Sequence, residues 1–152
     1  LIKQARELGI TAKIMAGDTW ENVTIIENAG EAAEGVTLST FFDEADPTAA
    51  DFVKGFKEYL NANPESLEKN GGEGVAAVSA LGYDAYMTAI AAIQAAGSTE
   101  SQAIRDALPG VSITGVTGAI SFDENGDAKK DMAYIKTVDG GAFKFLKTVT
   151  IQ

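Results

Sequence analysis

The stretch "KIMAGDTWENVTIIENAGEAAEGVTLSTFF", Lys13 to Phe42, decides the fold class. It begins with a short apolar run at 12–16, which has the length of a buried strand. Gly35 opens a second run, rich in β-branched and aromatic residues, which is typical of a strand. Between the two, residues 21–29 fit a short helix. The inward-facing residues of that helix are predicted to be Val23, Ile26 and Ala29.

The preceding stretch, "LIKQARELGI", has helical spacing, with Leu1, Ala5 and Leu8 on one face and Gly9 as a stop signal. It starts without an initiator Met and directly on helical periodicity. We therefore expect the chain to be a fragment that begins inside a helix. Residues 1–40 predict the order helix–strand–helix–strand, the alternation of a Rossmann-like parallel sheet with flanking helices.

The next segment is predicted to form an amphipathic helix followed by a loop. Asp46 is a good N-cap ahead of Pro47, and apolar residues follow at i, i+3 and i+4 spacing. The apolar residues are Ala49, Phe52, Val53, Phe56, Tyr59 and Leu60. Residues 61–74 are polar, with Pro64 and several glycines, and predict a surface loop.

A long alanine-rich helix is predicted at about 75–96. Its only charge is Asp84, so it should be buried on most sides rather than on one. Gly97 should end it, and Ser98 or Thr99 should cap the next helix, 99–108. The inward-facing residues of that next helix are predicted to be Ala103, Ile104, Ala107 and Leu108.

From Pro109 the chain takes on β character. Asp139-Gly140 lies between two strand-like runs and predicts a terminal β-hairpin. In the last run, alternation places four apolar residues on one face, so one side of that strand should be buried. These four are Phe143, Phe145, Val149 and Ile151.

Composition excludes several classes of function. The chain has 152 residues, with 22 acids against 12 bases and a formal charge of −10, so it should bind neither nucleic acid nor an anionic membrane surface. It has no Cys and no His, which removes thiol catalysis, the usual zinc sites and His-based triads. The charge of Asp84 argues against a membrane span at 75–96. We expect no enzyme activity, because no nucleophile, base and oxyanion hole assemble.

Asp18 is the first candidate binding residue. It follows the run at 12–16 directly, and ligands of parallel α/β sheets bind outside the carboxyl ends of strands. A carboxylate there could receive a ligand ammonium, or it could cap the helix at 21–29. Thr19 or Asn22 could also serve as that cap. Position alone favours capping.

The remaining motifs have simpler interpretations. Trp20 could form a cleft wall, although packing against the next helix is the better interpretation. Tyr83 and Tyr86 are core tyrosines by default, and one hydroxyl could still reach a cleft. "DENGD", 123–127, has part of a calcium-loop pattern without its later Gly and Glu, so it predicts a turn and no metal site.

Several segments taken together resemble one family. They are "GDTWEN", "AAEGVTLSTFFDEADPTAADFVKGFKEYL", "GYDAYMTAIAAIQAAGS" and "GAISFDENGDAKKDMAYIKTVDGGAFK". In order and spacing, they are similar to the C-terminal part of branched-chain amino acid type substrate-binding proteins of ABC transporters, which have the type I periplasmic binding fold. The similarity runs from Leu1 almost to Gln152.

The resemblance implies a partial two-lobed architecture. Residues 1–39 would belong to the C-terminal lobe, 40–128 to a crossover and part of the N-terminal lobe, and 129–152 to the return into the C-terminal lobe. In amino-acid-binding members, the acid at the position of Asp18 pairs with the ligand's α-ammonium. The resemblance therefore favours the ligand over the cap. It also places Thr19, Trp20, Val78 and Tyr83 near the ligand.

The resemblance implies a non-enzymatic receptor that closes around an apolar or branched-chain amino acid and serves an ABC permease. The expected location is periplasmic or extracellular, with a lipid anchor in a Gram-positive organism. A ligand-sensing domain of the same fold is the alternative, and a small α/β enzyme is a weaker one. No cofactor is expected. Because a partial fold leaves strand edges uncovered, we also expect the chain to self-associate.

Overall fold

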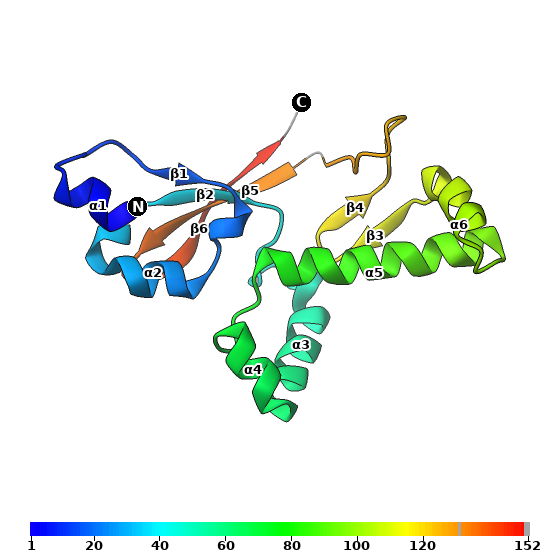
Figure 1. Cartoon of the computed structure of the whole chain (residues 1–152), viewed down its shortest axis with the longest axis horizontal. Helices are drawn as coiled ribbons and strands as arrows, with labels where there is room; N and C mark the ends of the chain where they lie inside the picture. Colours follow the sequence, from blue (N-terminus) through cyan, green and yellow to red (C-terminus); the bar gives the residue numbers. More distant parts are fainter. Residues whose placement is uncertain (131, 151–152) are drawn as a thin grey trace.

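The computed structural model describes residues 1–130 and 132–150, and its elements gather in two parts (Figure 1). The sheet unit consists of residues 1–40 and 132–150, and the helical unit consists of residues 42–130. The chain leaves the sheet unit after residue 40, and returns through a second connection before the terminal hairpin. Each unit has its own apolar cluster.

Helices and strands alternate in the first half of the sheet unit, as predicted. They are α1 (Ile2–Glu7), β1 (Met15–Ala16), the 3₁₀ helix η1 (Asp18–Trp20), α2 (Val23–Ala29), η2 (Gly30–Ala33) and β2 (Thr37–Thr40). The hairpin of β5 (Met132–Asp139) and β6 (Ala142–Thr150) completes the unit. The strand order is β1-β2-β5-β6, with β1 parallel to β2 and the remaining pairs antiparallel.

The shared face predicted for α1 and the inward face predicted for α2 are only partly buried. Leu1 and Leu8 are exposed, and the residue of α1 that enters the core is Ile2. Ile26 and Ala29 are buried as predicted, but Val23 is exposed at the start of α2. These helices are only six and seven residues long, so a change of about one position in the contact face reverses which residues are buried.

The run at 12–16 is shorter and more open than a buried strand. Only Met15–Ala16 pairs with β2, and Met15 is exposed because β1 lies at the edge of the sheet. The predicted strand after Gly35 is confirmed as β2, in which Leu38 and Thr40 are buried, as is Val36 just before it.

The helical unit contains η3 (Pro47–Ala49), α3 (Ala50–Ala62), α4 (Pro64–Asn70), α5 (Ala77–Ala96), α6 (Ser101–Ala107), η4 (Leu108–Gly110) and the hairpin of β3 (Ile113–Gly115) and β4 (Gly118–Ile120). Asp46 caps the entry as predicted, because its side chain accepts from Thr48 N at 2.8 Å. Ala49 and Leu60 are buried on the predicted face of α3, whereas Tyr59 is exposed.

The predicted loop at 61–74 is wrong, because α4 occupies much of it. Pro64 stands at the first helical position, where its fixed φ and missing N–H do no harm. Gly71 follows the helix with φ +75°, the left-handed conformation that ends many helices. The proline and the glycine thus delimit a helix rather than a loop.

The expectation that α5 is buried on most sides is also wrong. Its buried residues, Ala77, Ala80, Asp84, Thr88 and Ala92, recur along one face. The opposite face is apolar but open, with Val78 73% and Tyr86 66% exposed. Figure 1 shows α3 and the β3–β4 hairpin on two sides of this horizontal helix, which leaves part of its surface uncovered. No helix in the described ranges is both long enough and apolar enough to span a membrane.

The remaining predictions for the C-terminal half are confirmed in part. Gly97 ends α5 with φ +60°, as predicted. The predicted cap at Ser98 or Thr99 is wrong, because α6 begins after Glu100 without a side-chain cap, and Ser98 Oγ accepts instead from Glu100 N at 3.1 Å. The inward face of α6 is half-buried. The predicted hairpin forms, but a bulge in β6 opposite Ile135/Lys136 shifts its register. Val149 therefore does not share the face of Phe143 and Phe145. The predicted burial of one side of this strand is wrong, because Phe145 and Val149 are exposed and only Phe143 is half-buried. Ile151 lies outside the described residues.

Candidate functional site

Asp18 opens η1 at the carboxyl end of β1 and is half-buried. Asn22, not Asp18, caps α2, because Asn22 Oδ1 accepts from Thr24 N at 2.8 Å. Within residues 1–130 and 132–150, the Asp18 carboxylate has no hydrogen-bond or ion-pair partner. The capping interpretation is therefore wrong, and this carboxylate can accept donors from a ligand.

The two residues after Asp18 face different surroundings. Thr19 is exposed. The Trp20 ring packs against the apolar cluster of the sheet unit and borders a hollow of about 260 Å³ between α1 and α2. The packing role predicted for Trp20 is thus present, while a contact of Thr19 or Trp20 with a ligand stays a prediction.

Helix α5 lies against η1, so the predicted site residues come from neighbouring elements. Val78 is in the first turn of α5 and is largely exposed to solvent. The Tyr83 ring packs against Phe52 of α3 in a tilted arrangement, with ring centroids 4.9 Å apart, and Tyr83 is 43% exposed. A shared ligand contact of Asp18, Val78 and Tyr83 stays a prediction.

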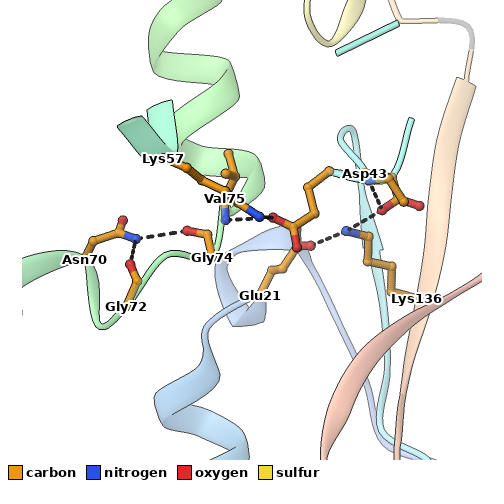
Figure 2. Close-up of polar contacts among 10 residues, drawn as sticks. Glu21, Asp43, Lys57, Asn70, Gly72, Gly74, Val75 and Lys136 are labelled. Carbon is orange, nitrogen blue, oxygen red and sulfur yellow. Dashed lines mark hydrogen bonds and ion pairs between the residues drawn. The ribbon is translucent and has the colours of Figure 1, made fainter. Parts of the chain in front are cut away.

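A buried charge cluster lies next to η1 and was not predicted from the sequence (Figure 2). Lys136 Nζ of β5 is 2.5 Å from Glu21 Oε1 and 3.5 Å from Asp43 Oδ1. The side chains of Lys136, Glu21 and Asp43 are 6%, 7% and 15% exposed. Thr40 Oγ1 donates to the other oxygen of Glu21 at 2.9 Å. Two carboxylates and one ammonium are thus held together where the chain leaves β2.

A second link joins the same strand to the helical unit. Tyr134, two residues before Lys136 and on the same face of β5, donates its hydroxyl proton to Asp46 Oδ2 at 2.8 Å. Burial and then the Asp46 carboxylate raise the pKa of Tyr134 to about 12. Hydrogen bonds from Thr48 and then from Tyr134 hold the pKa of Asp46 below its usual value.

The segment that leads into α5 is fixed by polar contacts, also drawn in Figure 2. Asn70 Nδ2 donates to the carbonyls of Gly72 at 2.6 Å and Gly74 at 2.9 Å. Val75 N donates to Glu44 Oε2 at 3.2 Å, and Lys57 Nζ lies 3.5 Å from the same oxygen. These contacts set where α5 begins, and hence where Val78 lies.

Asp84 is buried in the middle of α5, 2% exposed. Its carboxylate accepts from Val116 N at 2.8 Å, Thr117 N at 2.8 Å and Thr117 Oγ1 at 2.6 Å. These donors belong to the turn between β3 and β4, so Asp84 anchors that hairpin to the helix. The lone charge of α5 has a structural role away from Asp18.

The "DENGD" segment forms the predicted turn. Asp123 Oδ1 accepts from Asn125 N at 2.8 Å and from Asp127 N at 2.9 Å. These backbone donors, that of Asp127 foremost, lower the pKa of Asp123. No group of three or more acids that could hold a metal ion occurs in the part of the chain that the structure describes.

Comparisons with known proteins agree with this arrangement. The family model described as "Periplasmic binding protein" matches residues 1–142. The leucine-, isoleucine-, valine-, threonine- and alanine-binding protein of Pseudomonas aeruginosa is 30% identical over 131 residues, which is 85% of this chain and 32% of the relative. The chain thus spans about a third of that relative's length.

Two solved structures are similar in fold and sequence. A leucine-binding protein, LivK, of Thermotoga maritima matches with a TM-score of 0.78 at 37% identity, over 98% of this chain and 40% of that one. LivJ of Streptococcus pneumoniae, the substrate-binding protein of a branched-chain amino acid transporter solved with isoleucine, matches with a TM-score of 0.74 at 26% identity, over 99% and 40%. The predicted α/β fold class and resemblance are confirmed.

Proposed function

The chain belongs to the periplasmic binding protein family, and we propose that it supplies the ammonium-binding side of an amino acid receptor serving an ABC importer. The observation that carries this proposal is the Asp18 carboxylate, unpartnered within the described ranges, at the end of β1 and beside α5. The proposed receptor is not an enzyme and acts by binding alone.

The chemistry of Asp18 suits an amino acid ligand. A half-buried carboxylate forms charge-assisted hydrogen bonds with an ammonium group, and these are about twice as strong as neutral ones. Thr19 and Trp20 lie beside it in sequence, and Val78 and Tyr83 offer apolar surface from α5. That surface fits a branched or otherwise apolar ligand side chain, in keeping with the relatives whose names specify leucine and isoleucine.

Binding would bring the two units together around the ligand. Asp18 belongs to the sheet unit and Val78 to the helical unit, so one ligand touching both would favour a closed arrangement. The proposed location is periplasmic or extracellular, with an ABC permease as partner. A ligand-sensing receptor of the same fold is the second candidate, and loss of amino acid uptake on deletion would exclude it.

Calorimetry on the full-length protein tests this function. We expect L-leucine or L-isoleucine to bind the wild type, and Asp18→Ala to weaken binding at least tenfold, because a hydrogen bond to a charged group is worth about 1.5–3 kcal/mol. 4-Methylpentanoate, which is leucine without its ammonium group, should bind wild type and variant equally. Asp51→Ala, at an exposed position of α3, is the control. Unchanged leucine affinity in Asp18→Ala would remove Asp18 from the site.

We also propose that the 152-residue chain self-associates through the open face of α5. Val78, Tyr86 and Ile93 expose apolar surface along this face, and β1 has a free edge. Light scattering should show oligomers that Tyr86→Glu disperses. Tyr59→Glu, at a similarly exposed tyrosine of α3, should leave them intact. A monodisperse wild-type monomer would contradict the proposal.

A further inference from the structure

We infer that Lys136 is a positioning residue for the ligand site, acting through Glu21 on the segment that carries Asp18. The inference rests on the proposed function, since it concerns how Asp18 is held for an ammonium group. Lys136 lies in β5, far from η1 in sequence, and its ammonium reaches the residue that directly follows η1. Figure 2 shows Lys136 directed toward Glu21 and Asp43.

Glu21 is fixed through both carboxylate oxygens. Lys136 Nζ occupies Oε1 at 2.5 Å, and Thr40 Oγ1 occupies Oε2 at 2.9 Å. The partners stand on adjacent strands, because Lys136 in β5 pairs in register with Leu38 of β2. Glu21 therefore cannot turn away without breaking contacts to both strands.

The fixed side chain of Glu21 constrains the backbone of η1. Glu21 N donates to the Asp18 carbonyl at 2.9 Å, and this bond closes η1 at its C-terminal end. Asn22 N donates to the Trp20 carbonyl at 2.8 Å and fixes the exit of the segment. Contacts therefore run without a gap from Lys136 through Glu21 to the residue that carries the free carboxylate.

Burial makes Lys136 hard to replace. Its side chain faces two carboxylates away from solvent, so removing its charge would leave Glu21 and Asp43 buried near one another without a cation. The two acids would then repel, and Glu21 would turn toward water with the backbone of η1. Lys144, whose ion pair with Asp139 at 2.7 Å is exposed, offers a matched control on β6.

The test compares two ligands in the full-length protein. Wild type, Lys136→Met, Lys136→Arg and Lys144→Met are titrated with L-leucine and 4-methylpentanoate, after urea denaturation has verified that each variant is folded at the titration temperature. We expect Lys136→Met to weaken leucine binding roughly tenfold and to leave 4-methylpentanoate binding unchanged, because only the ammonium contact depends on Asp18. Lys136→Arg should restore most of the loss, and Lys144→Met should match the wild type.

The outcomes separate the inference from the function on which it rests. No leucine binding by the wild type would overturn the proposed function. Normal leucine binding by Lys136→Met, or an equal loss for both ligands, would overturn only the positioning role. If Lys136→Met does not fold, Glu21→Gln is tested in its place, because glutamine is nearly isosteric with glutamate. We expect a loss of about threefold for leucine alone, since an amide holds the lysine less firmly than a carboxylate does.

Discussion

The sheet unit and the helical unit each bury a charged side chain, but they satisfy it in opposite ways. In the helical unit, Asp84 accepts from two backbone N–H groups and one hydroxyl, all from adjacent residues of a single turn. In the sheet unit, Lys136 lies among carboxylates from two other segments of the chain, Glu21 and Asp43. One charge fixes a local hairpin, and the other ties together segments that meet at the junction of the units.

The difference has consequences for stability and for function. Backbone donors cannot move away from Asp84 without opening the β3–β4 turn, so replacing Asp84 should destabilise the helical unit. The partners of Lys136 are side chains beside the proposed ligand segment. Replacing Lys136 should therefore weaken ligand binding as well as lower the stability of the fold.

The largest expected effect is that of Asp84→Ala. The substitution leaves Val116 N and the buried Thr117 N without their acceptor, and we expect the free energy of unfolding to fall by about 3–5 kcal/mol. Urea denaturation followed by circular dichroism measures it. Asp51→Ala, at an exposed position, should change it by less than about 0.5 kcal/mol. A loss below about 1 kcal/mol for Asp84→Ala would remove Asp84 as the anchor of the helical unit.

The second prediction concerns the close approach of the hairpin to Asp84. A Cβ at Gly115 would overlap the Asp84 carboxylate, so Gly115→Ala should lower the free energy of unfolding by about 1–3 kcal/mol. Gly74→Ala is the control, because a Cβ there meets open space. Gly115→Ala should also cost less when Asp84→Ala is already present, since the crowded carboxylate is then gone. Additive losses in the double variant would contradict this geometry.

How much of the molecule the sequence predicts depends on the distance between partners. The order of elements from 1 to 40, the cap at Asp46 and the hairpin at Asp139-Gly140 follow from neighbours in sequence, and the structure has them. Asp84 is visible as the lone charge of an apolar helix, but its donors lie 32 and 33 residues away, so no spacing reveals them. The sequence did not predict α4, because the polar composition of residues 61–74, with several glycines, is typical of a loop. Pro64 and Gly71 nevertheless stand at the positions that begin and end a helix.

The candidate site shows the same limit. Asp18 was identified because a single acid follows an apolar run directly. Lys136 was missed although it alternates with Val138 and Tyr134 on a strand, since a lone lysine there is most simply read as solvent-exposed. The open face of α5 could not be predicted, because apolar composition does not tell which faces other elements cover. The burial of Lys136 and the exposure of one face of α5 both depend on segments that are distant in the sequence.

The smallest expected effect tests the other link between the units, from Tyr134 to Asp46. Tyr134→Phe removes one hydrogen bond, and we expect a loss of about 0.5–1.5 kcal/mol in the free energy of unfolding at neutral pH. The pKa of Tyr134 is raised to about 12 in the fold against 10 in the unfolded chain, so the stabilisation is complete below pH 10 and is lost as pH rises toward 12. The wild type should therefore lose stability more steeply than Tyr134→Phe between pH 10 and 12.

At acid pH the dependence of stability on pH has the opposite sign. The lowered pKa of Asp46 stabilises the fold above the ordinary value of 3.8, and this stabilisation is lost as pH falls. Tyr134→Phe removes one cause of that lowering, so its loss in acid should be smaller. Urea midpoints measured across both pH ranges, with Tyr59→Phe at an exposed tyrosine as control, check the prediction. Parallel curves for wild type and Tyr134→Phe would show that this hydrogen bond does not hold the two units together.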